Sequence, residues 1–157
     1  MARFLDDKSL RLLKPFLREL HASHLESLGF ELARRTRQVS RTRDGYREYF
    51  GLDVDWETSP EDYRGEFYIL CGIEFVGPDI PPDMNSVNGS CHFAWTLAEV
   101  VRGAKVNFRL GRGSDRAALA GEVLHGVLGA SARLARKARR LRARFLAGET
   151  ELTSPKL

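Results

Sequence analysis

The order of hydrophobic and polar positions predicts helices at both ends of the chain and strands between them. In residues 15–28, apolar side chains recur every three or four positions, which is the period of a helix. Pro15 suits the first turn of such a helix, and Gly29 supplies a left-handed stop after it. We therefore expect the first helix at residues 15–28, and residues 4–13 can add one or two helical turns before it.

The middle of the chain alternates apolar and polar residues, as half-buried strands do. Asp44 and Gly45 form a strong hairpin-turn signal between two such runs. The run at 67–76 is apolar on both faces, which favours a central place in a sheet. Residues 91–101 fit either an extended segment or the start of a short helix. The expected strands are 30–43, 46–56, 67–76 and 104–110.

The last apolar pattern predicts a long helix at 114–147, capped by Ser114 and Asp115. Unbroken, it would be about 50 Å long, whereas a globule of this chain length has a radius of gyration of about 15 Å. Such a helix breaks at Gly126 or Gly129, projects from the body, or pairs with a second copy. Its apolar residues follow the four-three spacing of an a/d seam: Ala120, Leu124, Val127, Ser131, Leu134, Ala138, Leu141 and Phe145.

These elements predict an α+β fold in a single domain. A mostly antiparallel sheet of four or five strands would pack against the N-terminal helix and the long C-terminal helix. Residues 1–113 would form the α+β core, 114–147 the long helix, packed on the core or projecting from it, and 148–157 a flexible tail. The expected core consists of Phe16, Leu20, Leu28, Leu52, Trp56, Phe67, Ile69, Cys71, Ile73, Phe108, Leu124 and Val127.

Composition narrows the class of protein. The chain of 157 residues is 43% hydrophobic and 29% charged, which argues against a disordered, collagen-like or membrane protein. The N-terminus lacks the apolar core of a signal peptide, so we expect a cytoplasmic protein. Two cysteines, Cys71 and Cys91, are few for a secreted disulfide framework, and whether they bond to each other stays open.

Charge is strongly segregated behind a formal net charge of +4. Residues 111–147 contain nine basic and two acidic residues, so this segment carries +7 and the rest of the chain −3. Residues 53–66 contain six acidic residues against Arg64 alone, a local charge of −5. A second arginine cluster lies on the predicted first hairpin: Arg34, Arg35, Arg37, Arg41, Arg43 and Arg47.

Two candidate binding surfaces follow from this segregation. The first is an acidic patch for a protein partner: Asp53, Asp55, Glu57, Glu61, Asp62 and Glu66. The second would bind nucleic acid or another anionic partner through Arg133, Arg136, Lys137, Arg139, Arg140, Arg142 and Arg144. Two further interpretations remain open for the basic run. It is a solvated helix face, with cations near the helix C-terminus, or it pairs with the acidic segment within the chain.

The chain offers no catalytic constellation. His21 and His24 are spaced to share one helix face and a metal ion, but no third ligand has a matching spacing. The turn at 111–114 has the glycines of an anion-binding loop, and any strand-to-helix turn needs them as well. There is no nucleotide-binding glycine motif and no nucleophile elbow. We therefore predict no enzyme activity, no catalytic residues, no cofactor and no metal site.

Several short strings resemble a family of small bacterial domains known as domain of unknown function 4304. They are Leu13-Lys14-Pro15, Leu28-Gly29-Phe30, the string FYILCGIEF at 67–75, and Cys91-His92 followed by Leu97 and Glu99. The resemblance covers about residues 10–110 and leaves out the basic C-terminal helix. Trp95-Thr96 stands where that family tends to have a basic residue, and the family supplies no catalytic residues.

The expected function is a non-catalytic protein-binding module. Small domains of the resembled kind often accompany bacterial toxin systems, so the resemblance implies a toxin-neutralising (immunity) or accessory protein. The alternative is nucleic-acid binding through the arginine-rich C-terminal helix. A protein partner, a nucleic acid or a second copy joined through the helix seam are the partners we consider, and a membrane is not among them.

Overall fold

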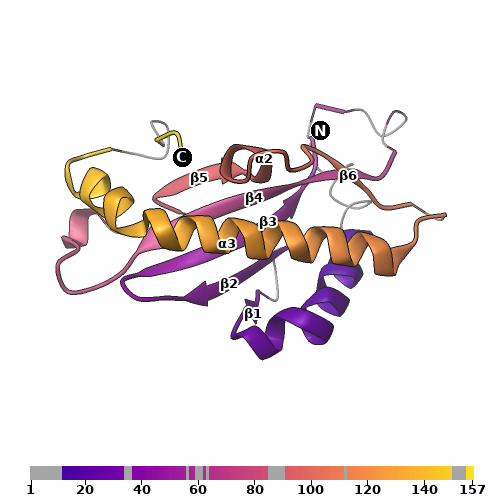
Figure 1. The fold of residues 1–157 in the computed structure, drawn as a ribbon, viewed down its shortest axis with the longest axis horizontal. Coiled ribbons are helices and arrows are strands. Elements are labelled where there is room, and N and C mark those ends of the chain that lie inside the picture. The colour runs from indigo at the N-terminus through magenta and orange to yellow at the C-terminus, as the bar shows by residue number, and fades with distance from the viewer. Residues whose placement is uncertain are drawn as a thin grey trace.

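The fold is an antiparallel sheet crossed by one long helix, α3 (Arg116–Leu146), as Figure 1 shows. It is the α+β architecture that the hydrophobic pattern predicts. The computed structural model describes residues 12–33, 37–55, 57–58, 62, 64–84, 91–111, 113–149 and 155–157. Within these residues, no helix is both long enough and apolar enough to cross a membrane.

The sheet has the strand order β1-β2-β3-β4-β5, with every neighbouring pair antiparallel. A sixth strand, β6, pairs with the first two residues of β4. The long β4 is central, as its two apolar faces predict. The strands are β1 (Glu31–Leu32), β2 (Gln38–Thr42), β3 (Tyr46–Asp53), β4 (Glu66–Phe75), β5 (Phe93–Thr96) and β6 (Phe108–Arg109).

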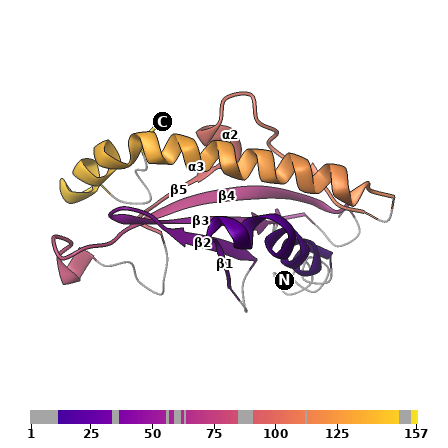
Figure 2. The same ribbon diagram turned by 60° about the horizontal axis from the view of Figure 1, so that its bottom comes forward.

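One face of the sheet is covered by helices. The β3–β4 register pairs Tyr46 with Phe75 and Phe50 with Cys71, and all four side chains are buried. Phe75 stacks on Phe145 of α3, so this is the face on which α3 lies. Figure 2 shows α3 running along that side of the sheet. The opposite face carries half-buried polar and aromatic residues, among them Arg47, Tyr49, Tyr68 and Glu74.

The N-terminal helix changes its winding along its length. Residues 12–20 are α-helical, followed by the π-helical turn η1 (His21–Leu25) and the 3-10 turn η2 (Glu26–Leu28). Gly29 ends it with a left-handed φ of 90°, as predicted. Residues 12–14 are already helical, so the helix begins before Pro15, as the apolar residues of 4–13 allow. The helix packs on the same face of the sheet as α3, because Phe16 contacts Phe67.

The helix α3 is continuous, so a break at Gly126 or Gly129 is wrong. Asp115 caps it as predicted, with its side chain accepting a hydrogen bond from the Ala118 amide. The predicted seam packs on the chain's own sheet, which leaves no seam free to pair with a second copy unless α3 leaves the sheet. Its buried members are Val127, Ser131, Leu134, Leu141 and Phe145.

A short helix, α2 (Leu97–Val100), packs against α3. A Cβ atom at Gly126 would lie 2.7 Å from Leu97 Cδ2, so any larger residue there would force the Leu97 side chain to move. The ambiguous segment 91–101 therefore contains both alternatives, the strand β5 followed by α2. Glu99 accepts a hydrogen bond from the Thr96 amide and closes a capping box at the junction.

Several boundaries differ from the prediction. The strand expected at 30–43 is divided into β1 and β2, and the strand expected at 104–110 shortens to β6. Leu28 is 42% exposed and is not a core residue, Leu124 is half-buried, and Trp56 lies outside the described residues. The tail predicted to be flexible touches the core at its end, where Trp95 Nε1 donates to the Pro155 carbonyl at 2.8 Å.

Candidate functional site

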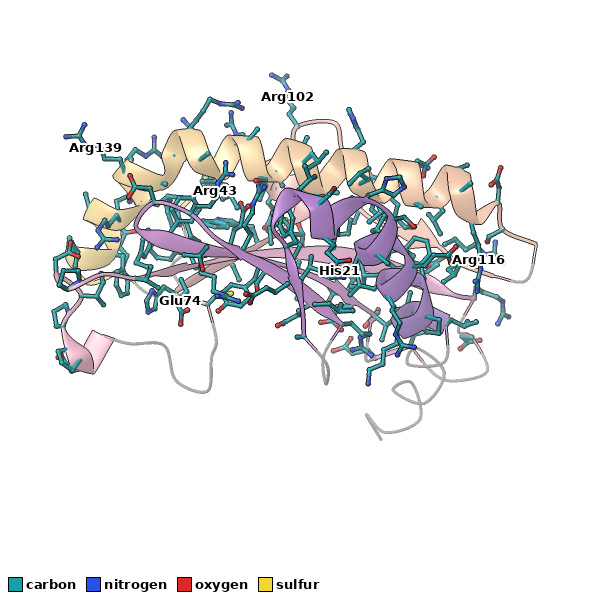
Figure 3. All side chains as sticks on the ribbon, turned by 90° about the horizontal axis from the view of Figure 1, so that it is seen from below. His21, Arg43, Glu74, Arg102, Arg116 and Arg139 are labelled. Atoms are coloured by element: carbon teal, nitrogen blue, oxygen red, sulfur yellow. The ribbon has the colours of Figure 1, made fainter. Side chains whose placement is uncertain are left out.

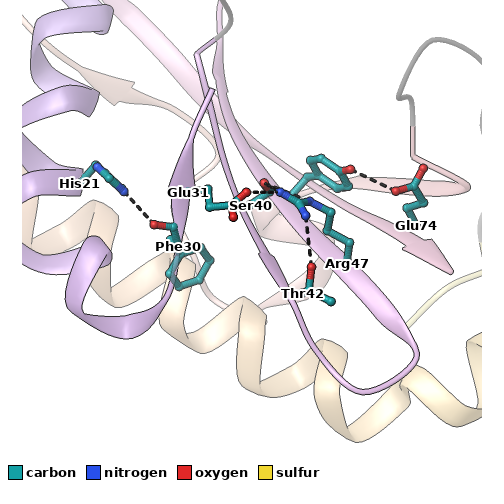
Figure 4. A network of polar contacts seen from close by, with 8 residues as sticks. His21, Phe30, Glu31, Ser40, Thr42, Arg47 and Glu74 are labelled. Atoms are coloured by element: carbon teal, nitrogen blue, oxygen red, sulfur yellow. Dashed lines mark hydrogen bonds and ion pairs between the residues drawn. The ribbon is translucent and has the colours of Figure 1, made fainter. Parts of the chain in front are cut away.

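The hairpin arginines are mostly bound within the chain. Arg41 lies 2.8 Å from Glu48, Arg47 lies 2.6 Å from Glu31, and Arg37 lies 3.6 Å from Asp53. Figure 4 shows Arg47 among the hydroxyls of Ser40 and Thr42, to which it donates further hydrogen bonds. These three guanidinium groups therefore serve the fold and are not a free cationic surface.

Arg43 is different from its neighbours on the hairpin. No acidic side chain among the described residues pairs with it, and it is exposed beside the turn at Asp44 and Gly45. Figure 3 shows Arg43 next to the C-terminal half of α3, the part of the helix that carries Arg139. The fold thus brings one arginine of the first cluster to the second cluster. Arg34 and Arg35 lie outside the described residues.

Four members of the acidic segment lie around Tyr68 in the described part of the chain. Asp53 is half-buried on the uncovered sheet face, near Arg37 and Tyr68. Burial, reinforced by the Asp53 carboxylate, raises the pKa of Tyr68. Glu57 is exposed, and Glu61 lies outside the described residues. The remaining members line a small pocket of about 130 Å³ together with Arg64: Asp55, Asp62 and Glu66.

The described acidic residues of 53–66 do not pair with the arginines of the basic helix. The acidic partners of its arginines in the described residues are Asp79 and Glu149, which lie outside 53–66. Arg142 pairs with Asp79 and donates to the carbonyls of Gly45 at 2.5 Å and Val76 at 3.2 Å. Arg144 lies 2.8 Å from Glu149. Arg142 and Arg144, predicted as partner-binding residues, are therefore engaged by the fold.

The other five predicted cations form what we term the basic surface. It consists of Arg133, Arg136, Lys137, Arg139 and Arg140. None of them has an acidic partner within the described ranges, and each is exposed or half-exposed. Arg140 donates to the Lys156 carbonyl at 3.3 Å and otherwise faces outward. At about 100° of helix rotation per residue, these side chains spread around the outer side of α3 instead of following one row.

Exposed apolar side chains accompany one flank of the basic surface. Leu128 and Leu146 are 37% and 41% exposed, although both are large and apolar. They lie eleven residues before and seven residues after Arg139, spacings that return to about the same side of a helix. Ala135 falls on the same line and is exposed. We term Leu128, Ala135, Arg139 and Leu146 the apolar–basic stripe.

A pocket of about 630 Å³ opens beside this stripe, between the β2–β3 hairpin and α3. Arg43, Tyr46 and Phe75 line it from the sheet, and Ala138 and Arg139 line it from the helix. Burial raises the pKa of Tyr46, while a hydrogen bond with Arg43 acts in the opposite direction. The phenol is therefore neutral at pH 7, and the positive charge of the pocket comes from its arginines.

The cysteines and histidines have structural positions. Cys71 and Cys91 are thiols and are not joined by a disulfide. Cys71 faces the core, and burial raises its pKa, which disfavours the reactive thiolate. Cys91 lies over Gly72, where an added Cβ atom would clash with its sulfur. Because Cys71 and Gly72 are adjacent in β4, the two thiols lie on opposite faces of the sheet.

The remaining candidate chemistry is used locally. His92 stacks on Phe145 and its Nδ1 accepts a hydrogen bond from the Phe75 amide at 2.9 Å. His21 Nε2 lies 2.7 Å from the Phe30 carbonyl oxygen (Figure 4). In the part of the chain that the structure describes, no group of three potential metal ligands gathers. At the turn before α3, Ser114 Oγ accepts from the Gly111 amide at 2.8 Å.

Two features of the site are not predicted from the sequence. The first is the pocket, whose lining residues are almost a hundred positions apart, because no local pattern predicts that the hairpin turn meets the end of α3. The second feature is the completely buried side chain of Glu48, which is 0% exposed. One signal for it exists in the sequence, because alternation places Glu48 on the same strand face as Phe50 and Leu52.

Comparisons with protein-family models, curated proteins and solved structures find no match to this chain. The resemblance to the domain of unknown function 4304 therefore stays a prediction. The basic surface, the apolar–basic stripe and the pocket are the features from which a function is argued.

Proposed function

We propose that the protein is a non-catalytic binding module that engages an acidic protein partner through the basic surface of α3. The support comes from the charges on this helix. Five cations on α3 lack acidic partners in the described residues, whereas Arg142 and Arg144 on the same helix are ion-paired. Such a surface attracts and orients a partner of opposite charge. A toxin-neutralising or accessory role is the finer form of this proposal, and it derives from the resemblance alone.

The observation that favours a protein over a nucleic acid is the apolar–basic stripe. Protein interfaces combine arginine with apolar anchors, which bury area as well as pairing charge. Phosphate contacts need only cations, and a single-strand binder adds aromatic side chains for base stacking. The described outer side of α3 offers Leu128 before the basic surface and Leu146 after it, and no aromatic residue.

Nucleic-acid binding is the second candidate, supported by the cation density of α3. The two candidates differ in their response to salt and to apolar substitutions. Phosphate binding weakens steeply as salt rises and is indifferent to Leu128 and Leu146. Binding of a protein at the stripe depends on both leucines.

Capture of partners from nuclease-treated host extract tests the proposal. The bait is the full chain, compared with an Arg136→Glu, Arg139→Glu, Arg140→Glu variant. The matched control reverses three exposed arginines elsewhere, Arg18, Arg102 and Arg116, and changes the net charge equally. We expect the control to retain a protein that the basic-surface variant and a Leu128→Ser, Leu146→Ser variant both lose.

Two results contradict the proposal. Equal capture by the two charge-reversed variants would show that the position of the arginines does not matter. If material is captured only when the nuclease treatment is omitted, and a duplex DNA oligonucleotide binds tightly with an affinity that falls steeply with salt, the nucleic-acid alternative is favoured.

A further inference from the structure

The pocket between the hairpin and α3 is formed before any ligand arrives. Its volume of about 630 Å³ lies within the range usual for ligand sites, about 300–1,000 Å³. Tyr46 and Phe75 at its floor are only 4% and 2% exposed, so they belong to the hydrophobic core and cannot collapse inward. Ala135 and Ala138 contribute small methyl groups on the helix side, which leaves the space open.

The rim of this pocket is positive. Arg43 and Arg139 line it, and the described residues provide no acidic partner for either. Arg142 also lines it, but its charge is met by Asp79. Asp44 is the carboxylate at the rim. Arg43, which also hydrogen-bonds Tyr46, and Arg139 bring two positive charges against one carboxylate and favour an anionic ligand group. The neutral phenol of Tyr46 does not oppose it.

The apolar walls of the pocket favour a ligand that has an apolar group as well as an anionic one. A carboxylate alone would gain nothing from the methyl groups of Ala135 and Ala138 or from the aromatic edges below them. An aromatic ring would occupy part of this space, contact the alanine methyl groups and lie within reach of the guanidinium groups. Arg142 already shows this preference, because its guanidinium lies 5.9 Å from the centre of the Phe75 ring.

We infer that this pocket takes an aromatic side chain of the acidic partner, with an adjacent carboxylate held by Arg43 and Arg139. The inference rests on the proposed function. It commits to a partner segment because the pocket is continuous with the apolar–basic stripe, sharing Ala135 and Arg139 with it. A free aryl carboxylate has the same chemistry, and the experiment separates the two sources.

The probes are two capped pentapeptides, each with four glutamates around a central phenylalanine or a central alanine. Binding is followed by nuclear magnetic resonance of the isotopically labelled full chain, reading the amide signals of Gly45 and Ala135. Burial of one phenylalanine side chain predicts that the phenylalanine peptide binds at least about tenfold more tightly than the alanine peptide.

A matched pair of substitutions locates the effect. Ala135→Phe places a ring in the pocket from α3 and blocks the ligand's place there, whereas Ala132→Phe adds the same side chain at an exposed position that does not line the pocket. Both alanines are exposed, so both variants keep the helix, which circular dichroism verifies. We expect Ala135→Phe to abolish the difference between the two peptides and Ala132→Phe to preserve it.

The outcomes distinguish this inference from the proposed function. If both peptides bind equally and reversal of Arg136, Arg139 and Arg140 abolishes binding, the acidic-partner proposal stands and the pocket inference is overturned. If neither peptide binds the unmodified chain, the proposed function itself is contradicted. If phenylacetate binds the pocket as tightly as the phenylalanine peptide does, the ligand is a small molecule, and the assignment to a partner segment is overturned.

Discussion

Ser131 of α3 and Glu48 of β3 join the long helix to the middle of the sheet. Ser131 Oγ lies 2.9 Å from both carboxylate oxygens of Glu48, and both residues are buried. Arg41 completes the contact, donating to Glu48 and, at 2.8 Å, to Ser131. It also donates to the Leu28 carbonyl at the end of the N-terminal helix. One polar cluster thus holds both helices against the strands.

Removal of the Ser131 hydroxyl is expected to destabilise the fold. Ser131→Ala leaves the buried Glu48 carboxylate with one donor fewer, so the free energy of unfolding should fall by about 1–3 kcal/mol. Glu48→Ala should cost about 3–5 kcal/mol, because it leaves the Arg41 charge without its partner. Urea unfolding measures both. Ser23→Ala, at an exposed helical serine, is the control, and an equal effect there would contradict the role of the cluster.

The sequence predicts those helices and strands whose formation depends mainly on the spacing of their own apolar side chains. The four-three spacing in 114–147 predicts α3, because it places the apolar residues on one face of a helix. The two apolar faces of 67–76 predict the central β4. The lengths of the edge strands are harder to predict. They depend on how many backbone groups find a neighbouring strand, so that 104–110 retains only the two residues of β6.

The candidate site is harder to predict from the sequence, because it too depends on contacts between distant parts of the chain. Charge alone suggests that every arginine in 133–144 is a binding residue. The fold nevertheless engages Arg142 with Gly45, Val76 and Asp79, which are more than sixty positions away. Only tertiary structure distinguishes a cation that stabilises the fold from one that is free to bind.

A comparison of two glycines tests the close crossing of α3 and α2. Gly121 has no neighbour within 4 Å of an added Cβ atom, so Gly121→Ala should gain about 1 kcal/mol of helix stability. At Gly126 the methyl group would press on Leu97, and overpacking costs about 1–3 kcal/mol. Gly126→Ala should therefore be less stable than Gly121→Ala by at least about 1 kcal/mol in urea unfolding. Equal stabilities of the two variants would show that α2 yields at this contact.

Arg142 is expected to matter more for stability than its ion-pair partner. Arg142→Ala removes a charged donor from the carbonyls of Gly45 and Val76, which should cost about 1–3 kcal/mol. Asp79→Asn should change stability little, because Asp79 is exposed and a surface ion pair contributes little. Arg136→Ala is the control for loss of an exposed arginine.

The same variant has a spectroscopic consequence. The hydrogen bond from Arg142 lowers the pKa of Asp79, so the pKa of Asp79 should rise towards its ordinary value in Arg142→Ala. A carboxylate titration by nuclear magnetic resonance measures this change. If Asp79→Asn destabilises the chain as strongly as Arg142→Ala does, the ion pair and not the carbonyl contacts would hold the hairpin to α3.

Alkaline pH should weaken the fold through Tyr49. Burial, the charge of Glu74 and the hydrogen bond to its carboxylate, 3.1 Å long, raise the pKa of Tyr49 from 10.0 to about 12. Below pH 10 the phenol is protonated in both the folded and the unfolded chain, so its contribution to stability is complete. Between about pH 10 and pH 12 the unfolded chain loses this proton and the folded chain keeps it, so the free energy of unfolding falls as pH rises.

Urea unfolding across this range should show a shallower fall for Tyr49→Phe, which has no proton to lose. Glu74→Gln should also make the fall shallower, because it removes the charge that opposes the phenolate. An unchanged slope in Tyr49→Phe would show that other groups cause the alkaline loss of stability.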